Sequence, residues 1–246
     1  FALFDTAGKQ VGTTVASSAS LTAAANTSSP TTAITPTVKI AVANPELWSV
    51  ARPYLYTLKV TTDSGDAKNV SIGIYSTKWT GDMGFYLNEE HVKIRGFCNH
   101  ESFGGVGMAI PDRVNLFRTQ GLRSVGGNGW RMSHNPVSPP LLDILDRIGV
   151  VSMDETRELH SDPISIMNMG AMVKRDRNHA SVVIWSYCNE GGCGSDGAPE
   201  FRNITEKYDG TRPTLGNRFG NQEMDATTDV EGFSHKAGSV FDTYNQ

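Results

Sequence analysis

Short apolar runs alternate with segments of helical periodicity from about residue 90 to residue 233. The run Val182-Val183-Ile184-Trp185-Ser186-Tyr187 is typical of a parallel strand that is covered on both faces. Repeated strand–helix units of this length predict a parallel α/β fold, and a (β/α)8 barrel is the leading candidate. Six strands are predicted where a closed barrel has eight, so we expect an incomplete barrel. The predicted strands are 92–97, 122–128, 150–153, 182–187, 213–217 and 228–233, and the predicted helices are 111–120, 139–148 and 164–177.

The part of the chain before about residue 80 follows a different pattern, rich in Thr, Ser, Ala and Val. Apolar and polar residues alternate over 37–42 and 54–60, a turn sequence lies at 63–66, and 71–75 predicts one more strand. Short alternating strands separated by turn residues predict an antiparallel β-sandwich. Residues 16–36 contain few large apolar side chains, so we expect a long exposed loop or ragged edge strands there.

Composition excludes several classes of protein. Lys and Arg total 22 and Asp and Glu total 26, which gives a net charge of −4 and argues against a partner that is a nucleic acid or an acidic membrane surface. No apolar run reaches the roughly 18–20 residues of a membrane span. Three cysteines are too few for a disulfide scaffold, and Cys188 and Cys193 are interpreted as packing residues or a local bridge. The chain begins at Phe1 without an initiator Met, so we expect it to come from within a longer protein.

Polar side chains follow four consecutive predicted strands of the α/β region. In a barrel of this kind the chemistry lies at the carboxyl ends of the strands. A single polar residue after a strand is usually a helix cap or a loop residue, but four strand ends in register favour a site. The residues are Asn99-His100-Glu101 after the first strand, Arg131 and Ser133-His134-Asn135 with the second, Asp154-Glu155 with the third, and Asn189-Glu190 after the fourth.

Glu190 is the most informative of these residues. It follows an apolar strand, and Gly191-Gly192 come directly after it, which lets the backbone turn closely around a ligand. A carboxyl group at this position suits a general acid, and the neighbouring Asn189 can donate a hydrogen bond to a substrate hydroxyl. The alternative interpretation is a surface glutamate that follows a strand.

The motifs around these residues resemble glycoside hydrolase family 2, which includes β-galactosidases, β-glucuronidases and β-mannosidases. The resemblance implies an immunoglobulin-like β-sandwich domain over 1–82, partial at its start, followed by a TIM-barrel domain over 83–246 that is truncated after about strand six. The segment Arg95-Gly-Phe-Cys-Asn-His-Glu101 is most similar to the β-galactosidase branch. The other matching stretches are Asn44-Pro-Glu-Leu-Trp-Ser49, Gly127-Asn-Gly-Trp-Arg-Met-Ser-His-Asn-Pro136, Met153-Asp-Glu155, Arg175-Asp-Arg-Asn-His179 and Ile184-Trp-Ser-Tyr-Cys-Asn-Glu190.

The resemblance also implies roles for individual residues. Glu190 matches the acid/base of the family, and Asn189 matches the asparagine that contacts the 2-hydroxyl group of the sugar. Glu158 and His160 resemble a pair that binds magnesium in some β-galactosidases; the segment 154–160 is one residue shorter than that pattern, so ordinary loop residues are the alternative. No other cofactor is implied. His100, Arg131, His134 and Glu155 match positions that line or support the substrate pocket.

One departure from the family pattern bears directly on activity. A retaining glycosidase uses an acid/base and a carboxylate nucleophile, and the family nucleophile is a Glu at the end of strand seven. This chain ends at Gln246, shortly after strand six, and Glu200, Glu206, Glu223 and Glu231 lie in unsuitable contexts.

We therefore expect the chain to be part of a retaining exo-β-glycosidase that hydrolyses terminal β-D-galactosides. We expect these 246 residues alone to be inactive. The alternative is a non-catalytic carbohydrate-binding remnant or a subunit of a larger assembly. The expected partner is a carbohydrate substrate, with no nucleic acid or membrane. A further chain that completes the barrel, or a homo-oligomer, is a possibility left open.

Overall fold

The structure is a computed structural model that describes residues 1–17, 38–157, 160–190, 197–218 and 228–233. The loop predicted over 16–36 lies almost entirely outside these residues. The chain forms two compact units. The first contains Phe1–Glu46 and Leu55–Ile72, and the second contains Leu47–Tyr54 and Gly73–Gln246.

The first unit is a four-stranded antiparallel sheet in the order β2-β1-β3-β4. The turn predicted over 63–66 joins β3 to β4, and Gly65 adopts a φ of 93° there. Residues 38–42 form no strand, and the strand predicted over 71–75 starts earlier because this turn pairs Tyr56 with Ile72 and Thr61 with Ala67. The strands are β1 (Ala2–Phe4), β2 (Gln10–Val11), β3 (Tyr56–Thr61) and β4 (Ala67–Ile72).

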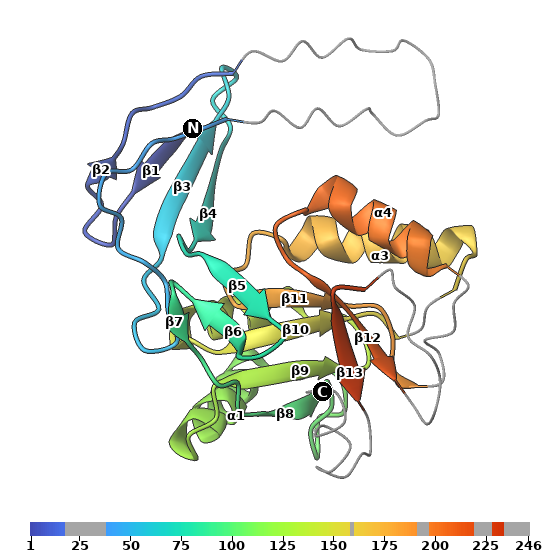
Figure 1. The fold of residues 1–246 in the computed structure, drawn as a ribbon. Coiled ribbons are helices and arrows are strands. Elements are labelled where there is room, and N and C mark those ends of the chain that lie inside the picture. The colour runs from blue at the N-terminus through green and yellow to red at the C-terminus, as the bar shows by residue number, and fades with distance from the viewer. Residues whose placement is uncertain (18–37, 158–159, 191–196, 219–227, 234–246) are drawn as a thin grey trace. The chain divides into compact units, whose positions relative to one another are not determined.

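The second unit contains a six-stranded parallel sheet whose strands follow one another in chain order, as in one side of a barrel (Figure 1). The sheet consists of β8 (Gly96–His100), β9 (Gly129–Ser133), β10 (Val151–Glu155), β11 (Val182–Ser186), β12 (Thr214–Arg218) and β13 (Val230–Phe233). A small antiparallel sheet precedes it, formed by β5 (Thr77–Thr80), β6 (Gly84–Leu87) and β7 (Glu90–His91). The predicted parallel, incomplete barrel is confirmed.

In the described part of this unit, four helices alternate with the parallel strands and bury the apolar core. They are α1 (Asp112–Ser124), α2 (Pro139–Ile148), α3 (Pro163–Asp176) and α4 (Ala198–Tyr208), and Figure 1 shows α3 beside α4. Among the described residues no helix is both long and apolar enough to cross a lipid bilayer. The largest fully buried side chains of this core include Met132, Leu141, Leu145, Met169, Trp185, Tyr187 and Phe201.

The boundary between α1 and β9 differs from the prediction. The helix was expected to end at Gly121 and a strand to begin at Leu122, but α1 continues to Ser124 and β9 begins at Gly129. One glycine costs a helix only about 1 kcal/mol, and the buried side chain of Leu122 holds the last turn against the core. The helix ends just before Gly126, whose φ of 82° suits a glycine.

The ends of α2 agree with the prediction. Pro139 is its first residue, where the missing N–H of proline removes no helical hydrogen bond. Gly149 ends the helix in the left-handed conformation, and its N–H donates to the carbonyl of Leu145. A Cβ atom at Gly149 would lie 2.5 Å from the carbonyl oxygen of Val50, so close packing also requires a glycine here.

The register between β10 and β11 shifts by one residue. Ser152 is paired with Val182, whereas Met153 is paired with Ile184 and Glu155 with Ser186. Val183 is thus an extra residue on β11. The shift lies near the beginning of both strands, and it sets which residues are neighbours at their carboxyl ends.

Asp154 is fully buried in β10 and lies near Asp176 of α3. Burial, and then repulsion from the carboxylate of Asp176, raises the pKa of Asp154 well above its ordinary value. Its carboxyl group therefore stays protonated in the folded protein well above pH 4, while in the unfolded chain it ionises near pH 4. The unfolded state then binds fewer protons, so the free energy of unfolding falls as the pH rises from about 4 towards the folded-state pKa.

We expect Asp154→Asn to remove this loss of stability, because an uncharged amide replaces the carboxyl group. The free energy of unfolding of the variant, relative to that of the wild type, should increase by about 1.4 kcal/mol per pH unit across the window. Urea unfolding between pH 4 and pH 8 measures the difference. Asp63→Asn, in an exposed turn, is the matched control and should give no such slope. Parallel pH profiles for Asp154→Asn and the wild type would contradict the prediction.

Candidate active site

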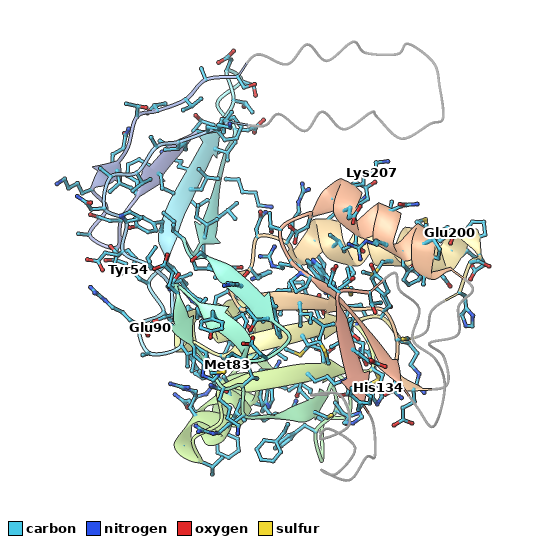
Figure 2. The ribbon with its side chains drawn as sticks, in the orientation of Figure 1. Tyr54, Met83, Glu90, His134, Glu200 and Lys207 are labelled. Atoms are coloured by element: carbon cyan, nitrogen blue, oxygen red, sulfur yellow. The ribbon has the colours of Figure 1, made fainter. Side chains whose placement is uncertain are left out.

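The carboxyl ends of β8 to β11 bring the predicted polar residues together at one end of the sheet. His100 ends β8, Glu155 ends β10, and Asn189-Glu190 follow β11. Arg131 lies in β9, and His134 directly follows that strand after a cis peptide bond. Figure 2 shows His134 near the arrowheads of the parallel strands.

Arg131 and Glu155 form a two-pronged ion pair between neighbouring strands. The Nε of Arg131 donates to Glu155 Oε2 at 2.9 Å, and its Nη2 donates to Oε1 at 3.0 Å. The side chain of Glu155 has no exposed surface, and that of Arg131 is 20% exposed. A buried carboxylate needs such pairing, because an uncompensated charge in a protein interior costs several kcal/mol.

Two further groups satisfy the carboxylate of Glu155. Nδ1 of His134 lies 2.9 Å from Oε1, and the hydroxyl of Ser186 donates to Oε2 at 2.8 Å. Glu155 therefore links β9, the loop after β9, and β11. These contacts are those of a residue that supports a site, because both carboxylate oxygens are engaged by protein groups.

Arg131 also orients Asn189. Its Nη2 donates to Asn189 Oδ1 at 2.8 Å, and the backbone N–H of Asn189 donates to the carbonyl of Arg157 at 3.4 Å. The amide oxygen is thus occupied, which fixes the orientation of the side chain. Within the described part of the chain, Asn189 Nδ2 makes no hydrogen bond, so it can donate to a ligand.

Glu190 is half-buried and has a φ of 43°. The left-handed conformation is uncommon for a residue other than glycine and costs about 1 kcal/mol or more, and such strain clusters at functional sites. Two residues before Glu190, Cys188 is fully buried and disulfide-bonded. Gly191, Gly192 and Cys193 lie outside the described residues.

His100 meets His134 edge to face, with ring centroids 5.4 Å apart. Behind it, Nη2 of Arg118 in α1 donates to the side chain of Asn99 and, at 2.9 Å, to the carbonyl of His100. Arg118 was not predicted, because nothing distinguishes it in sequence from other charged residues of that helix. Ser186 was missed because it lies inside an apolar run.

The remaining predicted residues lie elsewhere. Glu101 Oε1 accepts the backbone N–H of Ser138 at the start of α2, as a helix cap would. His160 is exposed and lines a pocket beside α3. Glu158 lies outside the described residues, so a magnesium site at Glu158 and His160 stays a prediction.

Sequence comparison identifies both units of the chain. Residues 80–161 and 156–237 match the TIM barrel domain of glycosyl hydrolases family 2. Residues 2–74 match a second domain model described as glycosyl hydrolases family 2. The matched regions agree with the observed parallel half-barrel and with the antiparallel sheet that precedes it.

Curated relatives are named as two kinds of glycosidase. The chain is 34% identical over 206 residues to a putative β-glucuronidase of Formosa agariphila, a match that covers 77% of this chain and 20% of that protein. It is 36% identical over 170 residues to a β-galactosidase of Bacteroides ovatus, covering 63% of this chain and 20% of that protein. The chain thus spans about a fifth of the length of these relatives.

Solved structures are similar in fold. A member of glycosyl hydrolase family 2 from Bacteroides cellulosilyticus has a TM-score of 0.72 at 31% identity, over 79% of this chain and 29% of that one. A β-glycosidase from Bacteroides vulgatus has a TM-score of 0.73 at 26% identity, over 83% of this chain and 28% of that one.

Proposed function

Since the chain belongs to glycoside hydrolase family 2, we propose that it is part of a retaining exo-β-glycosidase with Glu190 as the acid/base. The carbon–oxygen bond of the glycoside breaks as Glu190 gives its proton to the leaving oxygen. A carboxylate nucleophile forms a glycosyl ester, and Glu190 then takes a proton from the water that cleaves this ester. The nucleophile is proposed to be a Glu that the 246 residues do not contain.

The observation that supports this role is the fixed position of Asn189. Arg131 is held by two hydrogen bonds to Glu155 and donates to the amide oxygen of Asn189. The amide N–H groups of Asn189 can then donate to a sugar hydroxyl. Glu190 follows directly in the chain, so the proposed sugar-binding residue and the proposed proton donor are neighbours in sequence. Such preorganisation lowers the cost of reaching the transition state.

The proposed substrates are terminal β-D-galactosides. The support is the segment Arg95–Glu101, which is most similar to the β-galactosidase branch, and the curated relatives named as β-galactosidases. Other relatives are named as β-glucuronidases, so the glucuronide is the competing substrate to be measured.

We expect the longer protein that contains this chain to hydrolyse an aryl β-galactoside with a kcat/KM at least about tenfold above that for the matching aryl β-glucuronide. This ratio corresponds to a difference of about 1.4 kcal/mol in activation free energy between the two substrates. Initial rates with both substrates give the ratio. A reversed ratio would contradict galactoside specificity. Binding of both sugars without turnover would favour a non-catalytic carbohydrate-binding role.

The 246-residue chain alone should give no turnover of an aryl β-galactoside, because a retaining mechanism without its nucleophile forms no glycosyl ester. The assay compares the chain with its Glu190→Gln variant and with Glu200→Gln, an exposed glutamate of α4. Turnover that is lost in Glu190→Gln and kept in Glu200→Gln would mean that a nucleophile lies within these residues.

A further inference from the structure

A pocket of about 450 Å³ lies beside the predicted active site, against α3. Two of its walls follow site residues directly in the chain: Asn135 comes after His134, and Thr156-Arg157 come after Glu155. The third wall is α3, which contributes Ser165, Asn168 and Arg175. The pocket is therefore at the same end of the sheet as Asn189 and Glu190.

This pocket is separate from the inner face of the half-barrel. Arg131 lines a different cavity, together with Gly129, Val151 and Met153 of the parallel strands. No residue of α3 lines that inner cavity, and none of the strand residues named here lines the pocket beside α3. Asn189 does not line the pocket beside α3, so we place a group bound there on a part of the ligand other than the sugar at Asn189.

Arg175 presents a fixed cationic group to the pocket. Its Nε and Nη2 donate to the two carboxylate oxygens of Asp176 at 2.7 Å each, and Nη2 also donates to the carbonyl of Val137 at 2.7 Å. Asp176 has no exposed surface, whereas the side chain of Arg175 is 40% exposed. In the described part of the chain Nη1 makes no hydrogen bond, so the guanidinium is held in place with donors to spare.

The other lining groups favour an anion. Arg157 and His160 also line the pocket, and no Asp or Glu does so among the described residues. The two arginines of the lining contrast with the net charge of −4 of the whole chain. Asn135, Ser165 and Asn168 add neutral polar side chains. Arginine with neutral donors is the usual combination for planar or tetrahedral oxyanions.

We propose that this pocket binds a sulfate or carboxylate group on a sugar residue next to the one held at Asn189 and Glu190. The inference rests on the proposed function, because it places a saccharide at that site. The guanidinium of Arg175, with Arg157, binds the charged oxygens, and Asn168 contributes its amide. The ligand is an anionic oligosaccharide, and a neutral one leaves the pocket to water.

The experiment measures binding to the full chain by titration calorimetry. The three probes are neutral β-galactooligosaccharides, a chemically sulfated preparation of the same oligosaccharides, and inorganic sulfate. We expect the sulfated preparation to bind at least about tenfold more tightly than the neutral one. Inorganic sulfate at the same concentration should bind more weakly than the sulfated preparation, because it lacks the sugar contacts.

Three variants assign the effect to the pocket. Asn168→Asp adds a negative charge at an exposed position, and Arg157→Gln removes a positive one; each should abolish the tenfold preference and leave neutral binding unchanged. Neither depends on Arg175, whose removal would leave buried Asp176 without its partner. Arg113→Gln, an exposed arginine of α1 outside the pocket, should keep the preference.

Each other outcome overturns the inference. Equal binding of neutral and sulfated oligosaccharides would contradict the proposed anion binding in this pocket and would not affect the proposed function. If Asn168→Asp and Arg157→Gln still bind the sulfated oligosaccharides more tightly than the neutral ones, the anion binds outside this pocket. Inorganic sulfate that binds as tightly as the sulfated sugar would mean a free anion site, and failure of every oligosaccharide to bind would remove the proposed function as well.

Discussion

Glu190→Ala, made in the longer enzyme, should lower kcat for lactose-like substrates by about 10²- to 10⁴-fold, the usual contribution of general acid catalysis. A sugar alkoxide is a poor leaving group, so its oxygen must be protonated while the bond breaks. Formation of the glycosyl enzyme from an aryl glycoside with an acidic phenol should be affected far less, because the phenolate leaves without a proton.

For the activated aryl substrate, the second step should then become limiting, since water needs a general base. Azide, which needs no deprotonation, should attack the glycosyl enzyme and restore the rate. The measurements are kcat for both substrates, with and without azide, and Glu200→Ala on α4 is the control. Equal slowing of both substrates without azide rescue, in a folded variant, would remove Glu190 from the mechanism.

Glu155→Gln should lower the free energy of unfolding by about 3 kcal/mol or more, because it removes the buried charge that pairs with Arg131. The amide of Gln has one acceptor oxygen and one NH2 donor in place of two acceptor oxygens, so contacts with His134 and Ser186 are weakened as well. Urea unfolding measures the change as a lower midpoint at constant slope.

The matched control is Glu206→Gln in α4, which removes an exposed ion pair with Arg202 at 2.8 Å. An exposed pair of this kind is worth about 0.3–0.5 kcal/mol. Similar losses for Glu155→Gln and Glu206→Gln would mean that the pair at β9 and β10 does not support the fold. A large loss only for Glu155→Gln agrees with the role inferred from burial.

The grouping of polar residues at the strand ends was predictable because polar residues follow apolar runs, but the bounds of the second strand were wrong, since 122–128 was predicted and β9 is Gly129–Ser133. Arg131, His134, Glu155 and Asn189 do come together, although their roles in catalysis stay predictions. The contact of Ser186 with Glu155 was not predictable, since it depends on which residues of β10 and β11 are neighbours. Pairing between strands is a property of the sheet and leaves no local signal in either strand.

The predicted start of β9 was wrong for a related reason. Leu122 and Val125 are the only large apolar residues of 122–128, and so short a pattern does not distinguish a strand from the last turn of a buried helix. Burial of Leu122 in the core decides in favour of α1. The glycine that was expected to end the helix has open space around it and does not interrupt the turn.

The extra residue at Val183 bears on which residue of β11 lies beside Glu155 at the end of the sheet. With the shift, Ser186 lies beside Glu155; without it, the partner of Glu155 would be Trp185, whose indole N–H donates to Asp209. Residues that are paired across two strands point to the same face of the sheet, whereas successive residues of one strand point to opposite faces. A one-residue slip therefore exchanges the two faces. Deletion of Val183 would remove the bulge and leave Glu155 beside Ser186, whereas an inserted residue that takes a place in the ladder would put the indole of Trp185 beside the carboxylate. In this segment one residue can be lost without changing the pairing at the carboxyl ends, but one residue gained in the ladder changes it.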